Sequence, residues 1–477
     1  MTATPKEHTP AHGAEVLERI AIASDRLAVD ARGMMTVDGV SVDDLLGTFG
    51  TPLVVSVERT ILANYARIGR AFRERWDGPV EILYSFKSNN TLAIRTLLSH
   101  AGAGGDCFGE AELRATLETG TDPVRIALNG SDKSPDLIRL AVAEGVTINI
   151  DGEEEAAFIE RACHELGRRA KVNLRLKVLP EALDHFMGGS ALKHGPGVES
   201  VRRAKWGFTR PRALEILKGL LASPAIEVLG FSCHIGHLSN EPAAFAAVTG
   251  AFGATVLSLS KETGFTPSVL DIGGGWARER EPEQRAPSMT PVPIESQVEA
   301  ALDALKGSIA TLGGVPALWV EPGRYIVGNG QLILASVGAV KTDAGYAWAH
   351  VDVSTNNLPR IETGGFWYHI LPASKMKKPY DATYQVVGGT CFRSVLGADR
   401  RLPTLARGDI VAILDAGMYA EVFANQFNGM PRPAGVLVGM DGSVELIRQA
   451  ETAQDVFARH VIPSRLAKST GSKANAR

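Results

Sequence analysis

Between about residue 81 and residue 325, short β-branched or apolar runs alternate with segments of helical periodicity, and this alternation constrains the fold more than any other feature. Helical segments such as TLAIRTLLSHA, GEAELRATLETG and SPDLIRLAVAEG separate the runs. Eight strands with intervening helices predict an α/β fold closed into a (β/α)8 TIM barrel rather than an open doubly wound sheet. The eight runs are EILYSFK (81–87), AGAGGDC (101–107), RIALNG (125–130), VTINID (146–151), VNLRLKV (172–178), EVLGFSCHIG (227–236), SVLDIGGG (268–275) and ALWVEPGR (317–324).

The pattern changes after Arg324, so a chain of 477 residues is expected to hold more than one domain. Strand-like runs broken by Gly and Pro, including QLILASVGAV, YQVVGG, DIVAILDAG and GVLVGMDGSVELI, predict a C-terminal β domain, a sandwich or barrel. The stretch MTVDGVSVDDLLGTFGTPLVVS before the barrel could add a strand to it. We therefore expect a flexible N-terminal extension at 1–32, an N-terminal segment of the β domain at 33–57, the barrel at 58–325, the β domain at 326–450 and a C-terminal tail at 451–477.

Composition excludes several classes of function. With 45% hydrophobic and 22% charged residues, disorder is excluded as the main state, and a formal net charge of −3 argues against binding to nucleic acid or anionic lipid. The four cysteines form no CxxC pair, which argues against a disulfide framework and fits a reducing cytoplasm. The N-terminus lacks an apolar leader, and no stretch is expected to approach the length of a membrane span, so we expect a cytoplasmic protein.

Polar or glycine residues end nearly every predicted barrel strand, where the active site of such a barrel lies. Each has an ordinary structural explanation by itself, but their collection at one mouth indicates an active site. The long Gly- and Pro-bearing excursion at 181–205 is expected to form a lid or a wall of that site. The strand-end residues are Lys87, Asp106, Asn129, Asp151, Arg175, His234, Gly273, Gly274, Gly275, Glu321 and Arg324.

Three of these positions suggest particular chemistry. Lys87 follows an apolar run, so its ammonium must be paired or converted to an imine unless it is a solvated lysine that starts a loop. The glycines at 273–275 could let backbone N–H groups approach a phosphate, with Arg324 as counter-charge, or could form a tight turn without a ligand. Glu321 needs a cationic partner, which could be a protonated pyridine nitrogen, Arg324 or Arg360.

The segment SCHIGH contains three potential metal ligands, Cys233, His234 and His237. Adjacent residues on a strand point to opposite faces, so Cys233 and His234 cannot both face the mouth, and we expect no metal site. A flat imidazole stacked on a flat cofactor ring explains His234 better.

Taken together, the motifs resemble the fold-type III pyridoxal-phosphate decarboxylases, and most closely the diaminopimelate decarboxylase branch that neighbours the ornithine decarboxylases. The resemblance runs from about residue 33 to residue 447 in the same order and spacing. The motifs that carry it are YSFKSN, GGDCFGEAEL, ALNGSDKS, CHIG, DIGGGW, EPGRYIV, GGTCFRS, DAGMY and NGMPRPAGVLV.

The resemblance implies pyridoxal 5'-phosphate as cofactor and assigns a role to each matching residue. Lys87 would hold the cofactor as a Schiff base, His234 would stack on its ring and Glu321 would contact the pyridine nitrogen. Cys391 would donate a proton from the partner subunit of a homodimer with shared active sites, and Arg360 would bind a substrate carboxylate. The phosphate would be held by Gly273, Gly274, Gly275, Arg324 and Tyr419, with Asp106 and Gly323 as further cofactor contacts.

Departures from the family pattern concern the substrate. In diaminopimelate decarboxylases the active cysteine is followed by Glu, whereas Phe392 and Arg393 follow Cys391 here and would face the substrate. Gly364 stands where the family usually has Tyr, and His237 replaces a hydroxyl residue. The acid expected to hold a distal amino group is absent, so the sequence predicts a substrate other than meso-diaminopimelate.

Four interpretations therefore remain. The main one is a pyridoxal-phosphate-dependent carboxy-lyase that acts on an atypical amino acid or amino-acid derivative. The alternatives are the diaminopimelate decarboxylase of lysine biosynthesis, an amino-acid racemase on the same barrel, and a non-catalytic pyridoxal-phosphate-binding protein. A racemase lacks a clear Tyr as second base, and retention of Lys87 and Cys391 argues against a protein without activity.

Overall fold

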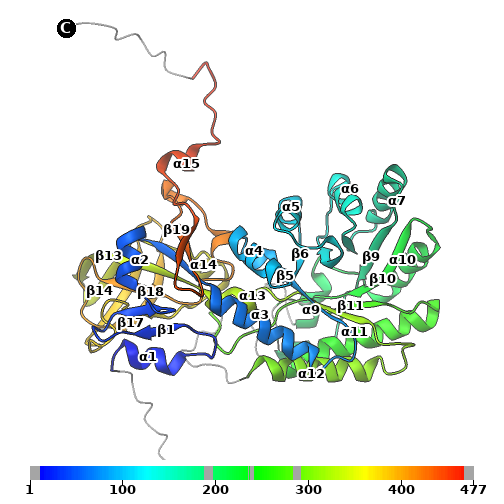
Figure 1. Ribbon diagram of the computed structural model, residues 1–477, viewed down its shortest axis with the longest axis horizontal. Coiled ribbons are helices and arrows are strands. Elements are labelled where there is room, and N and C mark those ends of the chain that lie inside the picture. Colours follow the sequence, from blue (N-terminus) through cyan, green and yellow to red (C-terminus); the bar gives the residue numbers. More distant parts are fainter. Residues whose placement is uncertain (1–10, 187–196, 235, 237–240, 283–291, 467–477) are drawn as a thin grey trace, which may run out of the picture.

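The computed structural model describes residues 11–186, 197–234, 236, 241–282 and 292–466, and it shows a barrel beside a β domain (Figure 1). Eight parallel strands close the barrel in the order β10-β11-β12-β5-β6-β7-β8-β9. All eight predicted strands and the predicted fold class are confirmed. The strands are β5 (Val80–Ser85), β6 (Gly104–Cys107), β7 (Ile126–Leu128), β8 (Thr147–Ile150), β9 (Ala170–Arg175), β10 (Ile226–Ser232), β11 (Val269–Asp271) and β12 (Ala317–Val320).

Helices surround the barrel, and local sequence sets their ends. In α6, Ser134 caps the first turn by accepting a hydrogen bond from the backbone N–H of Leu137, Pro135 occupies the first turn, and Gly145 ends the helix with φ +78°. The helices of this layer are α3 (Glu58–Arg73), α4 (Leu92–His100), α5 (Glu110–Glu118), α6 (Pro135–Glu144), α7 (Glu155–Leu166), α10 (Arg210–Ala222), α11 (Pro242–Thr263) and α12 (Ile294–Ser308).

Helix α11 corrects one expectation from the sequence. Its 22 residues are long and apolar enough to cross a membrane by length and composition, so the statement that no stretch approaches such a span is wrong. The helix packs against α12, and its Phe245, Val248, Phe252 and Val256 are buried in the barrel core. Burial inside a protein core explains an apolar helix without a membrane.

The β domain is built around a strand from the N-terminal side of the barrel. Strand β4 (Leu53–Val57) pairs antiparallel with β13 and parallel with β19. The order β17-β16-β14-β13-β4-β19-β20 describes the main path of the sheet, and β18 also pairs with β13 and β15. These strands are β13 (Gln331–Asp343), β14 (Tyr346–Val351), β15 (Ile370–Leu371), β16 (Ala382–Gly388), β17 (Val395–Leu402), β18 (Ile410–Ile413), β19 (Ala434–Val438) and β20 (Val444–Arg448).

The prediction of a flexible extension at 1–32 is wrong for much of that segment. Helix α1 (Gly13–Ile20) buries Leu17 and Ile20 in the core of the β domain, and β1 (Leu27–Val29) pairs with β2 (Met35–Val37). Apolar residues three positions apart give α1 one buried face, although the flanking residues are polar. Residues 1–10 lie outside the described part of the chain.

Five further short elements lie in the N-terminal segment, in the excursion at 181–205 and in the C-terminal tail. Strand β3 (Val40–Ser41) pairs with β2 and leads into α2 (Val42–Phe49), whose Val42 and Leu45 are buried. Within the excursion at 181–205, α8 (Leu183–Phe186) and α9 (Gly197–Arg203) are helical, whereas 187–196 lie outside the described residues. The C-terminal tail contains α15 (Ala453–Phe457), which begins with a capping box at Thr452.

Candidate active site

Lys87 lies in a short 3-10 turn, Phe86–Ser88, directly after β5. Its Nζ is 2.5 Å from Asp106 Oδ2 and lies 4.4 Å from the centre of the Phe108 ring. Burial would lower the pKa of Lys87, but the Asp106 carboxylate and then Glu321 raise it above its usual value. The lysine is therefore an ammonium that is 29% exposed, tethered to a fully buried carboxylate at the barrel mouth. It is not the solvated lysine of the alternative interpretation.

Asn129 joins the two carboxyl groups nearest the lysine. Its Nδ2 donates to Asp106 Oδ1 at 2.9 Å and to Glu321 Oε1 at 2.6 Å. Burial, followed by the charges of Asp106 and Asp271, raises the pKa of Glu321 well above its usual value. A cation placed against Glu321 would relieve this repulsion, so the cluster is suited to accept a positive charge.

Three site residues were missed from the sequence, and they continue this network below the mouth. Asn173 Nδ2 donates to Asn149 Oδ1 at 3.0 Å, and Asn149 Nδ2 donates to Asn129 Oδ1 at 2.9 Å and to Asp271 Oδ2 at 3.3 Å. Burial raises the pKa of Asp271 to about 6. Asn149 and Asn173 interrupt apolar strand runs, which is the signal that could have revealed them.

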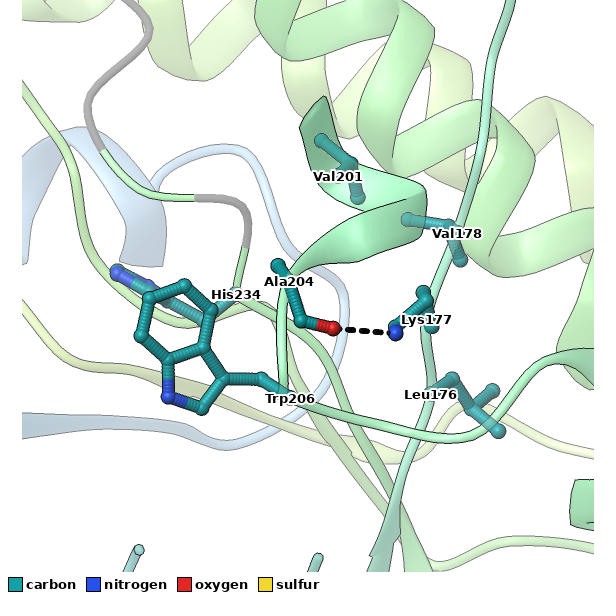
Figure 2. A pocket seen from close by; sticks show the side chains of 7 residues that line it. All are labelled: Leu176, Lys177, Val178, Val201, Ala204, Trp206 and His234. Atoms are coloured by element: carbon teal, nitrogen blue, oxygen red, sulfur yellow. Dashed lines mark hydrogen bonds between the residues drawn. The ribbon is translucent and has the colours of Figure 1, made fainter. Parts of the chain in front are cut away.

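His234 follows β10, and its imidazole accepts a hydrogen bond at Nδ1 from the backbone N–H of Gly274 at 2.9 Å. Burial, followed by the positive charges of Lys87 and Arg175, lowers the pKa of His234 to about 3. The ring is therefore neutral and carries its proton on Nε2. His234 and Trp206 lie together at a pocket that is also lined by Leu176, Lys177, Val178, Val201 and Ala204 (Figure 2).

The glycine turn after β11 needs glycine for steric reasons. Gly273 and Gly275 have φ of +68° and +95°, and a Cβ on Gly274 would lie 2.4 Å from the carbonyl oxygen of Glu321. Trp276 anchors the turn because its indole donates to the Gly273 carbonyl at 3.1 Å and stacks on Phe245 with centroids 4.5 Å apart. The turn thus brings bare backbone close to His234 and Glu321.

Arg324 and Tyr419 lie next to each other. Arg324 begins α13 (Arg324–Val327), and its guanidinium carbon is 5.8 Å from the centre of the Tyr419 ring. Its Nη1 lies 3.8 Å from Glu281 Oε2. The chain bends sharply at Tyr419, which has φ +55°, and the backbone N–H of Tyr419 donates to the Ser88 carbonyl at 2.8 Å. A basic and a phenolic side chain therefore converge near Lys87.

Gly323 packs against the turn that carries Lys87, since a Cβ at this glycine would lie 2.6 Å from Ser88 Oγ. Asp151 and Arg175, at the ends of β8 and β9, pair with each other at 3.0 Å. They form part of the wall beside Trp206, whose ring centre lies 6.0 Å from the Arg175 guanidinium carbon.

The candidate residues 391–393 of the β domain lie on the surface of the single chain, whereas Arg360 is half-buried. Cys391 is exposed, and its backbone N–H donates to Asn428 Oδ1 at 2.9 Å. Phe392 is 53% exposed, and Arg393 is also exposed. Arg360, on α14 (Arg360–Gly364), lies 4.9 Å from the centre of the Phe366 ring. The loop of Cys391 is thus held by its own domain.

Within the described ranges, no group of three His, Cys, Asp or Glu residues could hold a metal ion, and His237 lies outside those ranges. The donor set fits pyridoxal phosphate instead. It combines a paired lysine for an aldehyde, a neutral imidazole for an aromatic face, a buried acid for a cationic ring nitrogen, and glycines with an arginine for a phosphate.

Comparisons with known proteins agree with this chemistry over most of the chain. A family model described as "Pyridoxal-dependent decarboxylase, pyridoxal binding domain" matches residues 59–328, and one described as "Pyridoxal-dependent decarboxylase, C-terminal sheet domain" matches residues 324–417. Diaminopimelate decarboxylase of Archaeoglobus fulgidus is 31% identical over 433 residues, which cover 90% of this chain and 98% of that protein. The enzyme of the same name from Methanothermobacter thermautotrophicus is 29% identical over 444 residues, covering 93% and 99%.

Solved structures give the same result. A crystal structure of diaminopimelate decarboxylase from M. jannaschii superposes with a TM-score of 0.84 at 27% identity, covering 94% of this chain and 100% of that one. A second structure of that enzyme, in complex with L-lysine, gives a TM-score of 0.83 at 26% identity and covers 94% of this chain and 100% of that one.

Proposed function

Because the chain belongs to the pyridoxal-dependent decarboxylases, we propose that it releases carbon dioxide from an α-amino acid at the barrel mouth, with meso-diaminopimelate as the first candidate substrate. The protein is a pyridoxal-phosphate-dependent carboxy-lyase of (β/α)8 fold. The observation that carries the proposal is the hydrogen-bonded set at the mouth, in which a part-exposed Lys87 meets the buried Asp106, Asn129 and Glu321. Neither a racemase nor a binding protein without activity is favoured by a comparable observation.

Four residues of the mouth have a proposed role toward the aldehyde or the ring of the cofactor. When bound, pyridoxal phosphate supplies an aldehyde that captures amines and an electron-poor ring that stabilises a carbanion. Lys87 would hold the aldehyde carbon, with Asp106 keeping the lysine in place. Glu321 would hold the ring nitrogen in its cationic form, and neutral His234 would cover one face of the ring.

The phosphate would lie at the glycine turn. Gly273, Gly274 and Gly275 would offer backbone N–H groups, and Arg324 would supply positive charge. Tyr419 would donate its hydroxyl, and Gly323 would leave room beside Ser88.

The proton that replaces carbon dioxide needs a positioned donor. We assign it to the Cys391 thiol and assign the substrate carboxylate to Arg360. Because Cys391, Phe392 and Arg393 are exposed on one chain, we propose a homodimer in which this loop completes the partner's site. A cytoplasmic location belongs to the same proposal, since all four cysteines, which lie in described segments, are free thiols.

The relatives change the expected substrate. The sequence predicted a substrate other than meso-diaminopimelate, whereas relatives named diaminopimelate decarboxylase, at 29% and 31% identity, favour that alternative at least as well. A second candidate, an amino acid whose side chain is apolar or ends in an acidic group, is kept because of one observation. Phe392 and Arg393 present no carboxylate to a distal amino group.

A panel of amino acids distinguishes the two candidates. Carbon dioxide release is measured from meso-diaminopimelate, lysine, ornithine, apolar and acidic amino acids, with kcat/KM for each. The proposal predicts that meso-diaminopimelate is the best substrate of the panel. A higher kcat/KM for an apolar or acidic amino acid would transfer the assignment to the second candidate, and the absence of carbon dioxide release from all would contradict both.

A further inference from the structure

Six charged side chains form a buried cluster between the glycine turn and the N-terminal segment, which we call the buried charge cluster. Their exposed fractions lie between 0% and 7%. Among the described residues, three guanidinium groups face three carboxylates, and each charge has a partner. Its members are Asp25, Arg278, Arg280, Glu281, Arg324 and Asp415.

Arg280 is the centre of this cluster and joins segments that are far apart in the sequence. On one side its Nε and Nη2 donate to the two oxygens of Asp415 at 2.8 and 2.9 Å. On the other side its Nη1 and Nη2 donate to the two oxygens of Asp25 at 2.6 and 3.2 Å. Its Nη1 also donates to the Ile20 carbonyl at 2.8 Å. Only a planar fork of donors can make this double bidentate contact.

The Asp415 contact leads directly to the site. Asp415, at φ +60°, begins the loop that ends at Tyr419. The far end of this loop is attached next to Lys87, since Asn89 Nδ2 donates to the Gly417 carbonyl at 2.9 Å and the Tyr419 N–H donates to Ser88. Arg280 therefore holds Asp415, the first residue of the loop 415–419. This loop carries the Tyr419 side chain to the proposed phosphate site.

The carboxylate of Glu281 connects the cluster to Arg324. Glu281 follows Arg280 in the chain, and its Oε1 accepts from the backbone N–H of Arg278 at 2.9 Å. Its Oε2 lies 3.3 Å from Arg278 Nη2 and 3.8 Å from Arg324 Nη1. Both side chains proposed to contact the phosphate, Tyr419 and Arg324, are thus connected to residues 280–281.

We propose that Arg280, together with its partner Asp25 in the N-terminal segment, is a positioning residue for the phosphate group of the cofactor. The inference rests on the phosphate site proposed above and goes beyond it, because neither residue touches that site. Arg280 acts by holding the Tyr419 loop, and Asp25 acts by fixing the orientation of the Arg280 guanidinium.

The test compares pyridoxal phosphate with pyridoxal, which lacks the phosphate. Both are titrated into cofactor-free full-length protein, and binding at Lys87 is followed by absorbance. Arg280→Lys keeps the charge and loses the fork, so the affinity for pyridoxal phosphate should fall about tenfold while that for pyridoxal stays within about twofold. Arg59→Lys is the matched control, because Arg59 also joins two segments, by contacts to Asp38 and the Met440 carbonyl.

Asp25→Asn distinguishes a positioning role from an electrostatic role of the cluster. It also tests the inference if Arg280→Lys does not fold. This variant leaves three guanidinium groups against two carboxylates, so a purely electrostatic role predicts tighter binding of pyridoxal phosphate. Positioning predicts weaker binding, by about threefold to tenfold. Tighter binding, or an equal loss for pyridoxal, would overturn the inference.

Arg324→Gln separates this inference from the proposal on which it rests. Weaker binding of pyridoxal phosphate by Arg324→Gln, with no change for Arg280→Lys and Asp25→Asn, would refute the positioning role alone. Unchanged binding by Arg324→Gln would refute the phosphate placement and the positioning role with it.

Discussion

The barrel mouth and the Cys391 loop differ in how completely a single chain builds them. At the mouth, Asp106 and Glu321 are buried, and Lys87 already has its charged partner at 2.5 Å. In the β domain, Cys391 is exposed and Phe392 is 53% exposed. Under the proposed function, one chain alone would pre-organise the cofactor site, whereas the proposed proton donor and the proposed substrate contacts would lie on a surface that a second chain can cover.

We expect the largest loss of activity when Lys87 is removed. Lys87→Ala deletes the proposed attachment point at the mouth, so kcat should fall on the order of 10⁴-fold or more. In the unaltered protein, borohydride reduction and peptide mapping should label Lys87. Lys177→Ala is the control, since Lys177 lies at the pocket but donates to the Ala204 carbonyl. Labelling at another lysine would contradict the assignment.

Cys391→Ala removes the proposed proton donor from the exposed loop of the β domain. It should lower kcat by about 10² to 10⁴-fold, the usual contribution of a proton donor, and leave cofactor absorbance unchanged. The Cys391→Ala and Lys87→Ala variants are then mixed and allowed to exchange subunits. Their activity tests whether Cys391 and Lys87 of one site come from different chains. In a random mixture about half of the dimers are mixed, and each mixed dimer has one intact site out of two. About a quarter of the activity per site should therefore return. No recovery after demonstrated exchange would refute shared sites.

A smaller effect is expected from a change in the Cys391 loop that tests its part in substrate choice. Phe392→Glu places a carboxylate where none is present, so the ratio of kcat/KM for meso-diaminopimelate to that for an apolar amino acid should rise about tenfold. Tyr346→Glu, at a residue 57% exposed on β14, is the matched control. An unchanged ratio would show that residue 392 does not face the substrate.

The smallest expected effect concerns the neutral imidazole of the buried half. His234 has a pKa of about 3 in the folded chain and about 6.5 when unfolded, so below pH 6.5 the unfolded state binds a proton that the folded state does not. Folding stability from this group is therefore lost as the pH falls from about 6.5 toward 3.

The stability of wild type alone does not isolate His234, because the pKa of Asp271 is raised to about 6 and this group gains stability on acidification. The measured quantity is therefore a difference in stability between two proteins. The free energy of unfolding of cofactor-free wild type, minus that of His234→Phe, should decrease by less than about 1 kcal/mol per pH unit on acidification, since the ring is partly exposed. A constant difference would contradict a neutral His234.

Local periodicity was sufficient to predict the barrel, since each of its strands is a short apolar run followed by a helix. The same logic predicted Lys87, Asp106 and Glu321, because strand ends meet at one mouth. It did not predict β14 and β17, whose half-exposed residues lack a clear apolar run. Nor could it reveal Arg280 with Asp25, because their contact spans 255 positions and no local pattern records it.

The place of β4 has a consequence for the order in which the chain can be made. Its five residues are buried between β13 and β19, strands that are synthesised long after it. A nascent chain that has completed the barrel still carries β4 as an apolar strand with both edges open, a form prone to mispairing. The β domain can close only once Val438 has left the ribosome, so an isolated N-terminal fragment ending at residue 325 should aggregate unless β4 is removed.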